Sequence, residues 1–172
     1  MASEIRGSDN FDSGAEAITL GTEVATTSGT AIDFTGIPAG VKRITVMFNG
    51  VSTSGTSQRL IQIGPVGGIE TSSYVSSSVH FNASALSSGS STVGFIIRYL
   101  TSSDLVSGVM TLNRLAGNRF VSGLNLTSTG TSVTCAYGSG NKLLAGELSV
   151  VRLTTVNGTD TFDAGSINIS WE

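Results

Sequence analysis

The chain has 172 residues, of which 12% are charged and 39% are hydrophobic, and its formal net charge is −3. Because a typical globular chain carries about 25% charged residues, much of this surface must consist of Ser, Thr, Asn and Gly, and so little charge protects weakly against self-association. Only nine residues are Lys or Arg, and they are scattered along the chain, which excludes nucleic acid as an expected partner.

The first fifteen residues have no periodic pattern and mix Ser, Gly, Asp and Asn, so this segment cannot fold alone. In a monomer it would be a frayed tail. In an assembly it would be an arm that becomes ordered on a neighbour, with Ile5 and Phe11 as apolar anchors. Both alternatives stay open, and we expect residues 16–172 to form one folded domain.

The folded part is predicted to begin with residues 16–20. Residues 23–26 are then predicted to form a hairpin with residues 31–34 across a short turn that contains Gly29. A second turn is expected from Gly36 to Gly40, because glycine accepts positive φ and the proline between them fixes its own φ.

Residues 42–49 are the stretch around which the chain is organised. They are rich in β-branched and aromatic side chains that alternate with polar ones, which predicts a central strand with one buried face. The dipeptide Asn49-Gly50 follows, and it is typical of a tight turn with positive φ at both central positions.

Two further strands are predicted at residues 58–63 and 74–81, followed by a serine-rich loop at residues 83–91. Alternation places the side chains of the second strand on two faces. One face has Tyr74, Ser76, Ser78 and His80, and the other has Val75, Ser77, Val79 and Phe81.

The rest of the chain continues as short strands. They are predicted at residues 92–100, 109–115, 120–126, 132–137, 143–155 and 165–171, with turns at 116–118, 127–130 and 138–141. About ten strands without a helical period predict an all-β fold, an antiparallel β-sandwich or jelly roll. The residues that we expect to be buried are Ile44, Val46, Phe48, Phe95, Ile97, Leu124, Leu148, Val150, Ile167 and Ile169.

Two segments of the chain carry a family resemblance. The order SGTAIDFTGIPAGVKRITVMFNGVSTSG at residues 28–55, joined to LTTVNGTDTFDAGSINISWE at residues 153–172, resembles the β-rich modules in tail-fibre and other virion structural proteins of tailed bacteriophages and prophages. The resemblance covers the chain from about Thr22 onward. It offers no catalytic motif that could be transferred to residues of this sequence.

The resemblance implies a non-enzymatic virion structural protein, made in the host bacterial cytoplasm, that serves as a tail-fibre or tail-tip module in assembly and host attachment. It implies a homotrimer, with other virion proteins bound through the N-terminal arm and a host surface glycan as a further partner. The alternatives are a capsid decoration protein and a polysaccharide-degrading tailspike fragment. The chain has no internal repeat of the kind a long β-helix needs, which argues against the tailspike.

Few residues could carry chemistry. His80 is the only histidine, and no Gly-x-Ser-x-Gly motif accompanies it, which argues against a serine hydrolase. Tyr74 and His80 are either hydrogen-bonded strand residues or part of a polar and aromatic sugar-binding face. Asp160 and Asp163 are either a carboxylate pair for glycoside cleavage or turn residues that bind their own backbone, and the second interpretation fits better.

The same segment offers oxygen ligands for Ca²⁺ from Asn157, Asp160 and Asp163, but without the spacing of an EF-hand loop. Cys135 is the only cysteine, so it can form neither an intrachain disulfide nor a cysteine-based zinc site, and we expect it to be buried. No apolar run approaches the length of about 20 residues that crosses a bilayer. The sequence therefore predicts no catalytic, cofactor or metal residue and no membrane insertion.

Overall fold

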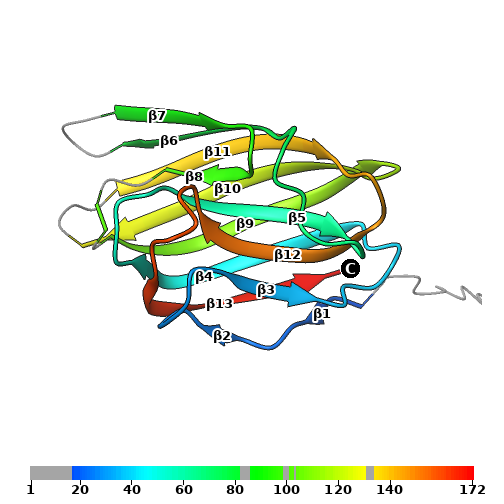
Figure 1. The fold of residues 1–172 in the computed structure, drawn as a ribbon, viewed down its shortest axis with the longest axis horizontal. Coiled ribbons are helices and arrows are strands. Elements are labelled where there is room, and N and C mark those ends of the chain that lie inside the picture. The colour runs from blue at the N-terminus through cyan, green and yellow to red at the C-terminus, as the bar shows by residue number, and fades with distance from the viewer. Residues whose placement is uncertain (1–16, 82–85, 99–100, 103, 131–133) are drawn as a thin grey trace, which may run out of the picture.

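The computed structural model describes residues 17–81, 86–98, 101–102, 104–130 and 134–172. In these residues the only regular secondary structure is β-strand, and two antiparallel sheets stack face to face (Figure 1). This confirms the predicted all-β sandwich. The proposed N-terminal arm, with Ile5 and Phe11, lies outside the described residues.

The large sheet has the strand order β1-β13-β4-β9-β10-β11-β6-β7, with β2 also paired to β13, and the small sheet has the order β3-β12-β5-β8. The strands are β1 (Thr19–Leu20), β2 (Val24–Ala25), β3 (Ile32–Thr35), β4 (Arg43–Thr53), β5 (Arg59–Pro65), β6 (Val75–Phe81), β7 (Leu86–Ser91), β8 (Phe95–Ile97), β9 (Leu105–Ala116), β10 (Arg119–Thr129), β11 (Thr134–Leu143), β12 (Leu148–Thr155) and β13 (Phe162–Trp171).

The chain crosses repeatedly between the two sheets. From β3 in the small sheet it passes to β4 in the large one, returns for β5, and repeats this exchange up to β13 (Figure 1). The predicted hairpin of residues 23–26 with 31–34 is therefore wrong. Val24 and Ala25 pair with β13, whereas β3 pairs with β12 in the other sheet. Gly29 has φ = 78°, but it redirects the chain from one layer to the other.

The central strand is longer than predicted. β4 pairs with β13 on one side and β9 on the other, and it continues through Asn49-Gly50, where we predicted a turn. Gly50 does have the expected positive φ, 64°, but as part of a β-bulge. The opposing Gly165, with φ = 87°, lies so close that a side chain there would collide with the Gly50 carbonyl. The Asn49-Gly50 dipeptide thus predicted the positive φ correctly, but this φ serves a bulge within a strand and not a turn between strands.

Three predicted breaks are also strand, at least in part. Residues 86–91 of the serine-rich loop form the edge strand β7, residues 127–129 of a predicted turn end β10, and residues 138–141, predicted as a turn, lie inside β11. A Cβ at Gly138 would lie 2.8 Å from the Ser77 carbonyl oxygen, and one at Gly140 would also collide with the backbone of β6. These glycines allow two strands to approach closely, which their turn propensity does not reveal.

The core lies between the sheets. All ten residues predicted to be buried are buried, among them Ile44 and Val46 of the central strand, which are fully inaccessible. The expected turn between Gly36 and Gly40 is present, with φ of 72° and 88° at its ends. The sandwich therefore rests on the apolar halves of strands that the sequence pattern identifies.

Candidate interaction face

The middle of the outer face of the large sheet, turned away from the small sheet, has three parallel rows of side chains that cross seven strands from β13 to β7. None of the residues in these rows is charged: they are Ser, Thr, Asn, Gly, Cys, Tyr or aliphatic and aromatic apolar residues. The rows are Ser170, Thr45, Thr111, Gly123, Ser139, Ser77 and Ser90; Asn168, Met47, Val109, Asn125, Tyr137, Val79 and Ser88; and Ser166, Asn49, Ser107, Thr127, Cys135, Phe81 and Leu86.

β6 has the reverse of the usual polarity. The predicted alternation is confirmed, but the polar half, Ser76, Ser78 and His80, faces inward and is buried, while Val75 is 64% exposed on the outer face. The reason lies in β8, the edge strand of the small sheet. The Ser76 hydroxyl accepts a hydrogen bond from the backbone N–H of Ile96 at 2.9 Å, and the Ser78 hydroxyl accepts one from the backbone N–H of Arg98 at 3.3 Å. The inward serines thus accept hydrogen bonds from backbone N–H groups at the edge of the small sheet, which apolar core side chains cannot do.

An apolar patch results on the outer face, made of Val79, Phe81, Leu86 and Tyr137 from β6, β7 and β11, while Val75 lies beyond the row of Ser139, Ser77 and Ser90. Val79 is paired with Tyr137, and Phe81 with Leu86. The rings of Phe81 and Tyr137 stack with centroids 5.8 Å apart at 12°, and they are 40% and 45% exposed. A shallow hollow of about 350 Å³ lies beside them and is lined largely by serines of the three strands. Water-exposed aromatic area of this kind marks a contact surface.

Tyr74, one of the two predicted sugar-binding residues, is buried at 1% exposure. Its hydroxyl accepts a hydrogen bond from the Ile63 N–H at 2.8 Å and lies 3.0 Å from the Glu70 carbonyl oxygen, and its ring packs edge-on against Phe95 at 5.1 Å. Burial raises the pKa of the Tyr74 phenol far above its ordinary value. The ring cannot stack on a sugar at the surface, so the predicted face does not form around it.

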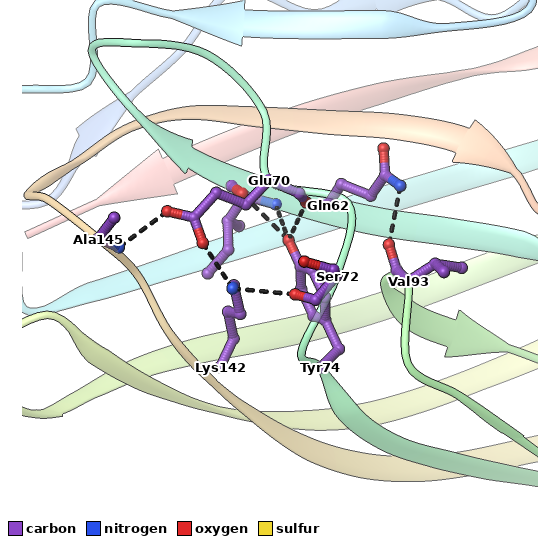
Figure 2. Close-up of polar contacts among 8 residues, drawn as sticks. Gln62, Glu70, Ser72, Tyr74, Val93, Lys142 and Ala145 are labelled. Atoms are coloured by element: carbon purple, nitrogen blue, oxygen red, sulfur yellow. Dashed lines mark hydrogen bonds and ion pairs between the residues drawn. The ribbon is translucent and has the colours of Figure 1, made fainter.

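Tyr74 belongs to a polar network that positions β6 (Figure 2). The Lys142 ammonium lies 2.5 Å from a Glu70 carboxylate oxygen, donates to the Ser72 carbonyl at 3.0 Å, and lies 5.2 Å from the centre of the Tyr74 ring. The other Glu70 oxygen accepts the Ala145 N–H at 2.8 Å. Burial alone would raise the pKa of Glu70, but the hydrogen bonds from Lys142 and Ala145 and the lysine charge outweigh it and lower this pKa. The network fastens the segment before β6 to the β11–β12 connection.

His80 is also buried, at 1% exposure, and points to the inner side of β6. Within the described part of the chain, neither ring nitrogen has a hydrogen-bond partner. Burial lowers the pKa of the imidazole, the Arg98 charge lowers it further, and Asp104 opposes them. A neutral ring enclosed in the sandwich cannot reach a ligand on the outer face, so the second predicted ligand residue does not lie at a surface site either.

The side-chain oxygens of the loop before β13 are engaged within the protein. Asp160 accepts the Asn157 side-chain amide at 2.6 Å and the N–H of Ser57, in the β4–β5 connection, at 2.9 Å, rather than binding its own backbone. Asn157 accepts the backbone N–H groups of Thr159 and Asp160 in the loop. Asp163 is in β13 rather than in a turn, and it accepts the hydroxyl of Ser52. Among the described residues, no three His, Cys, Asp or Glu side chains gather where a metal ion could bind.

Cys135 is half-buried on the outer face rather than buried, next to Phe81 on the neighbouring strand. The sequence missed the outer-face patch because Phe81 and Tyr137 are 56 positions apart and their strands show no local sign of being neighbours. In the described residues, no helix is long and apolar enough to cross a membrane. No family model, curated protein or solved structure matches the chain.

Proposed function

We propose that the chain is a non-enzymatic structural subunit of a bacteriophage virion, most consistent with a tail-fibre or tail-tip module, that assembles with copies of itself and takes part in host attachment. The observation that carries the self-assembly is the band of three rows on the outer face, which crosses seven strands without a charged side chain. The assignment to a virion, and the preference for a homotrimer, come from the resemblance of residues 28–55 and 153–172.

The physical support is the behaviour of uncharged surfaces. Charged side chains keep proteins apart in solution, and a face without them keeps little protection against association. Cyclic symmetry closes such contacts and prevents them from growing into fibres. A protein that repeats many times in a virion requires these properties.

The location test is immunogold labelling of purified virions from bacteria that carry the gene, with antibodies raised against the purified chain. We expect gold at the tail tip or fibres. Gold spread over the head would instead favour a capsid decoration protein. Purified particles that contain none of the chain by mass spectrometry would overturn the assignment to the virion.

The assembly test is sedimentation velocity of the purified chain at low micromolar concentration. We expect a homo-oligomer that survives dilution, because obligate interfaces bury on the order of 2,000 Å² or more. A single species of monomer mass at all concentrations would contradict self-assembly while leaving the virion location untouched.

A further inference from the structure

We infer that copies of the chain bind one another through the apolar patch of Val79, Phe81, Leu86 and Tyr137, and that the patches of neighbouring copies meet at the symmetry axis. The inference rests on the proposed function and adds the surface that carries it. Residues close to a symmetry axis meet their own equivalents, whether the axis relates two copies or three.

In the native register of β6, the described residues leave the patch exposed to water. The inward positions of β6 are taken by Ser76 and Ser78, whose hydroxyls accept the backbone N–H groups of Ile96 and Arg98. Turning the apolar half of β6 inward would break these bonds and leave buried N–H groups without partners, at about 1–3 kcal/mol each. Keeping the native register and burying this apolar area therefore requires a further surface, which contributes about 25 cal/mol for each Å² covered.

The absence of charge favours a second copy as the occupant. A face that binds a different protein gains specificity and speed from complementary charges, whereas the three central rows of this face offer none. The charges of the adjacent row on the same face, Arg43 on β4 and Glu172 directly after β13, neutralise each other as an ion pair. When the three rows meet those of a second copy, no like charges are brought together within them. Serine, threonine and asparagine side chains both donate and accept hydrogen bonds, so the rows around the patch can pair with their own equivalents.

The area of the three rows is enough for a specific contact. Seven strands spaced about 4.8 Å apart, with three rows two residues apart along each strand, cover roughly 30 Å by 20 Å, or about 600 Å² on each copy before side-chain relief is counted. Two copies would therefore bury about 1,200 Å², the lower end of the range for specific interfaces, and the remaining area of an obligate interface would come from neighbouring residues. The arrangement of the rows matches such an interface, with aromatic and aliphatic residues grouped together and neutral polar residues beside them.

The experiment places one charge in the patch. Val79→Lys should weaken self-association by on the order of 100-fold, because the ammonium group would be buried without a partner. The matched control is Val66→Lys, since Val66 is exposed, apolar and outside the patch. Sedimentation velocity should show a smaller species for Val79→Lys and an unchanged oligomer for Val66→Lys, with the same circular dichroism spectrum for both. An unchanged oligomer in Val79→Lys would overturn the proposal.

A measurement on the unmodified chain covers the case in which Val79→Lys fails to fold. Cys135 is the only cysteine, is half-buried, and pairs with Phe81 across the β6–β11 ladder. Its rate of reaction with a thiol reagent should rise at least several-fold when dilution dissociates the oligomer. A rate that is the same in the oligomer and the monomer would overturn the proposal.

Two further outcomes separate this inference from the proposed function. If soluble host polysaccharide, rather than a second copy, protects Cys135 in a monomeric chain, the patch is a glycan site and the self-contact is wrong. If Val79→Lys dissociates the oligomer but virions contain none of the chain, the contact stands and the virion assignment fails.

Discussion

At the scale of the residue, Phe95 is the most informative core position. Its ring is buried and meets Tyr74 edge-on, and it lies against the glycine-containing part of β11. Phe95→Ala should therefore lower the free energy of unfolding by about 3–5 kcal/mol in urea denaturation. Val66→Ala, at an exposed position, should change it by less than about 0.5 kcal/mol. A cost for Phe95→Ala as small as that of the control would contradict the placement of Phe95 in the core.

His80 gives the sandwich a predictable pH dependence. Burial and the Arg98 charge lower the pKa of its imidazole in the folded chain, while in the unfolded chain it titrates near its ordinary value of about 6.5. At mildly acidic pH, His80 therefore binds a proton in the unfolded chain but not in the folded chain. Stability should be fully present above about pH 7 and should fall as the pH decreases through about 6.5 towards the folded-state pKa.

Urea denaturation between about pH 7.5 and about pH 5.5 measures this effect, because the carboxylates titrate mainly below that range. His80 is the only histidine, so His80→Leu should abolish the decrease. A decrease of the same size in His80→Leu would assign the effect to another group.

At the scale of the element, the facing bulges of β4 and β13 show two different reasons for a glycine: positive φ at Gly50, and both positive φ and close packing at Gly165. A Cβ at Gly50 would meet open space, so Gly50→Ala should cost only the positive φ, about 1–2 kcal/mol. A Cβ at Gly165 would collide with the Gly50 carbonyl, so Gly165→Ala should cost clearly more. Thermal unfolding of the two variants checks this order, and equal costs would show that the strands separate easily at the bulge.

The strand pattern was predictable from sequence wherever side chains alternate against an apolar core. β4 and β6 were both identified in this way, and Ile44 and Val46 were placed correctly inside. The direction of β6 was not predictable, because alternation gives two faces without saying which is inward. The backbone N–H groups of Ile96 in β8 and of Arg98 directly after it decide that direction, and they approach β6 only in the folded sandwich.

At the scale of the whole molecule, the division into two sheets was beyond the sequence. The turn at Gly29 looks like a hairpin turn, yet it carries the chain across the sandwich, because β13 and β12 provide partners that lie more than a hundred residues away. For the same reason the outer face could not be foreseen, since its rows join strands from both ends of the chain.

The proposed function also predicts an enzymatic result. Purified protein should release no reducing ends from host surface polysaccharide, because Asp160 is engaged by Asn157 in its own loop and by Ser57 in the β4–β5 connection. A reducing-end assay over several hours checks this. Release that is abolished by Asp160→Asn or Asp163→Asn would favour the polysaccharide-degrading tailspike instead.

The reversed polarity of β6 has a consequence for folding. A strand that slides by one residue against its neighbour turns all its side chains over, and for β6 this slip would send Val75, Val79 and Phe81 inward. An isolated chain thus has a competing misregistered state that hides apolar surface but loses the serine bonds to β8. If neighbouring copies cover the patch, the native register also removes the apolar surface from water. Assembly would then favour the native register over the slipped one. Refolding at high dilution should then trap more misregistered chains than refolding at concentrations where copies meet.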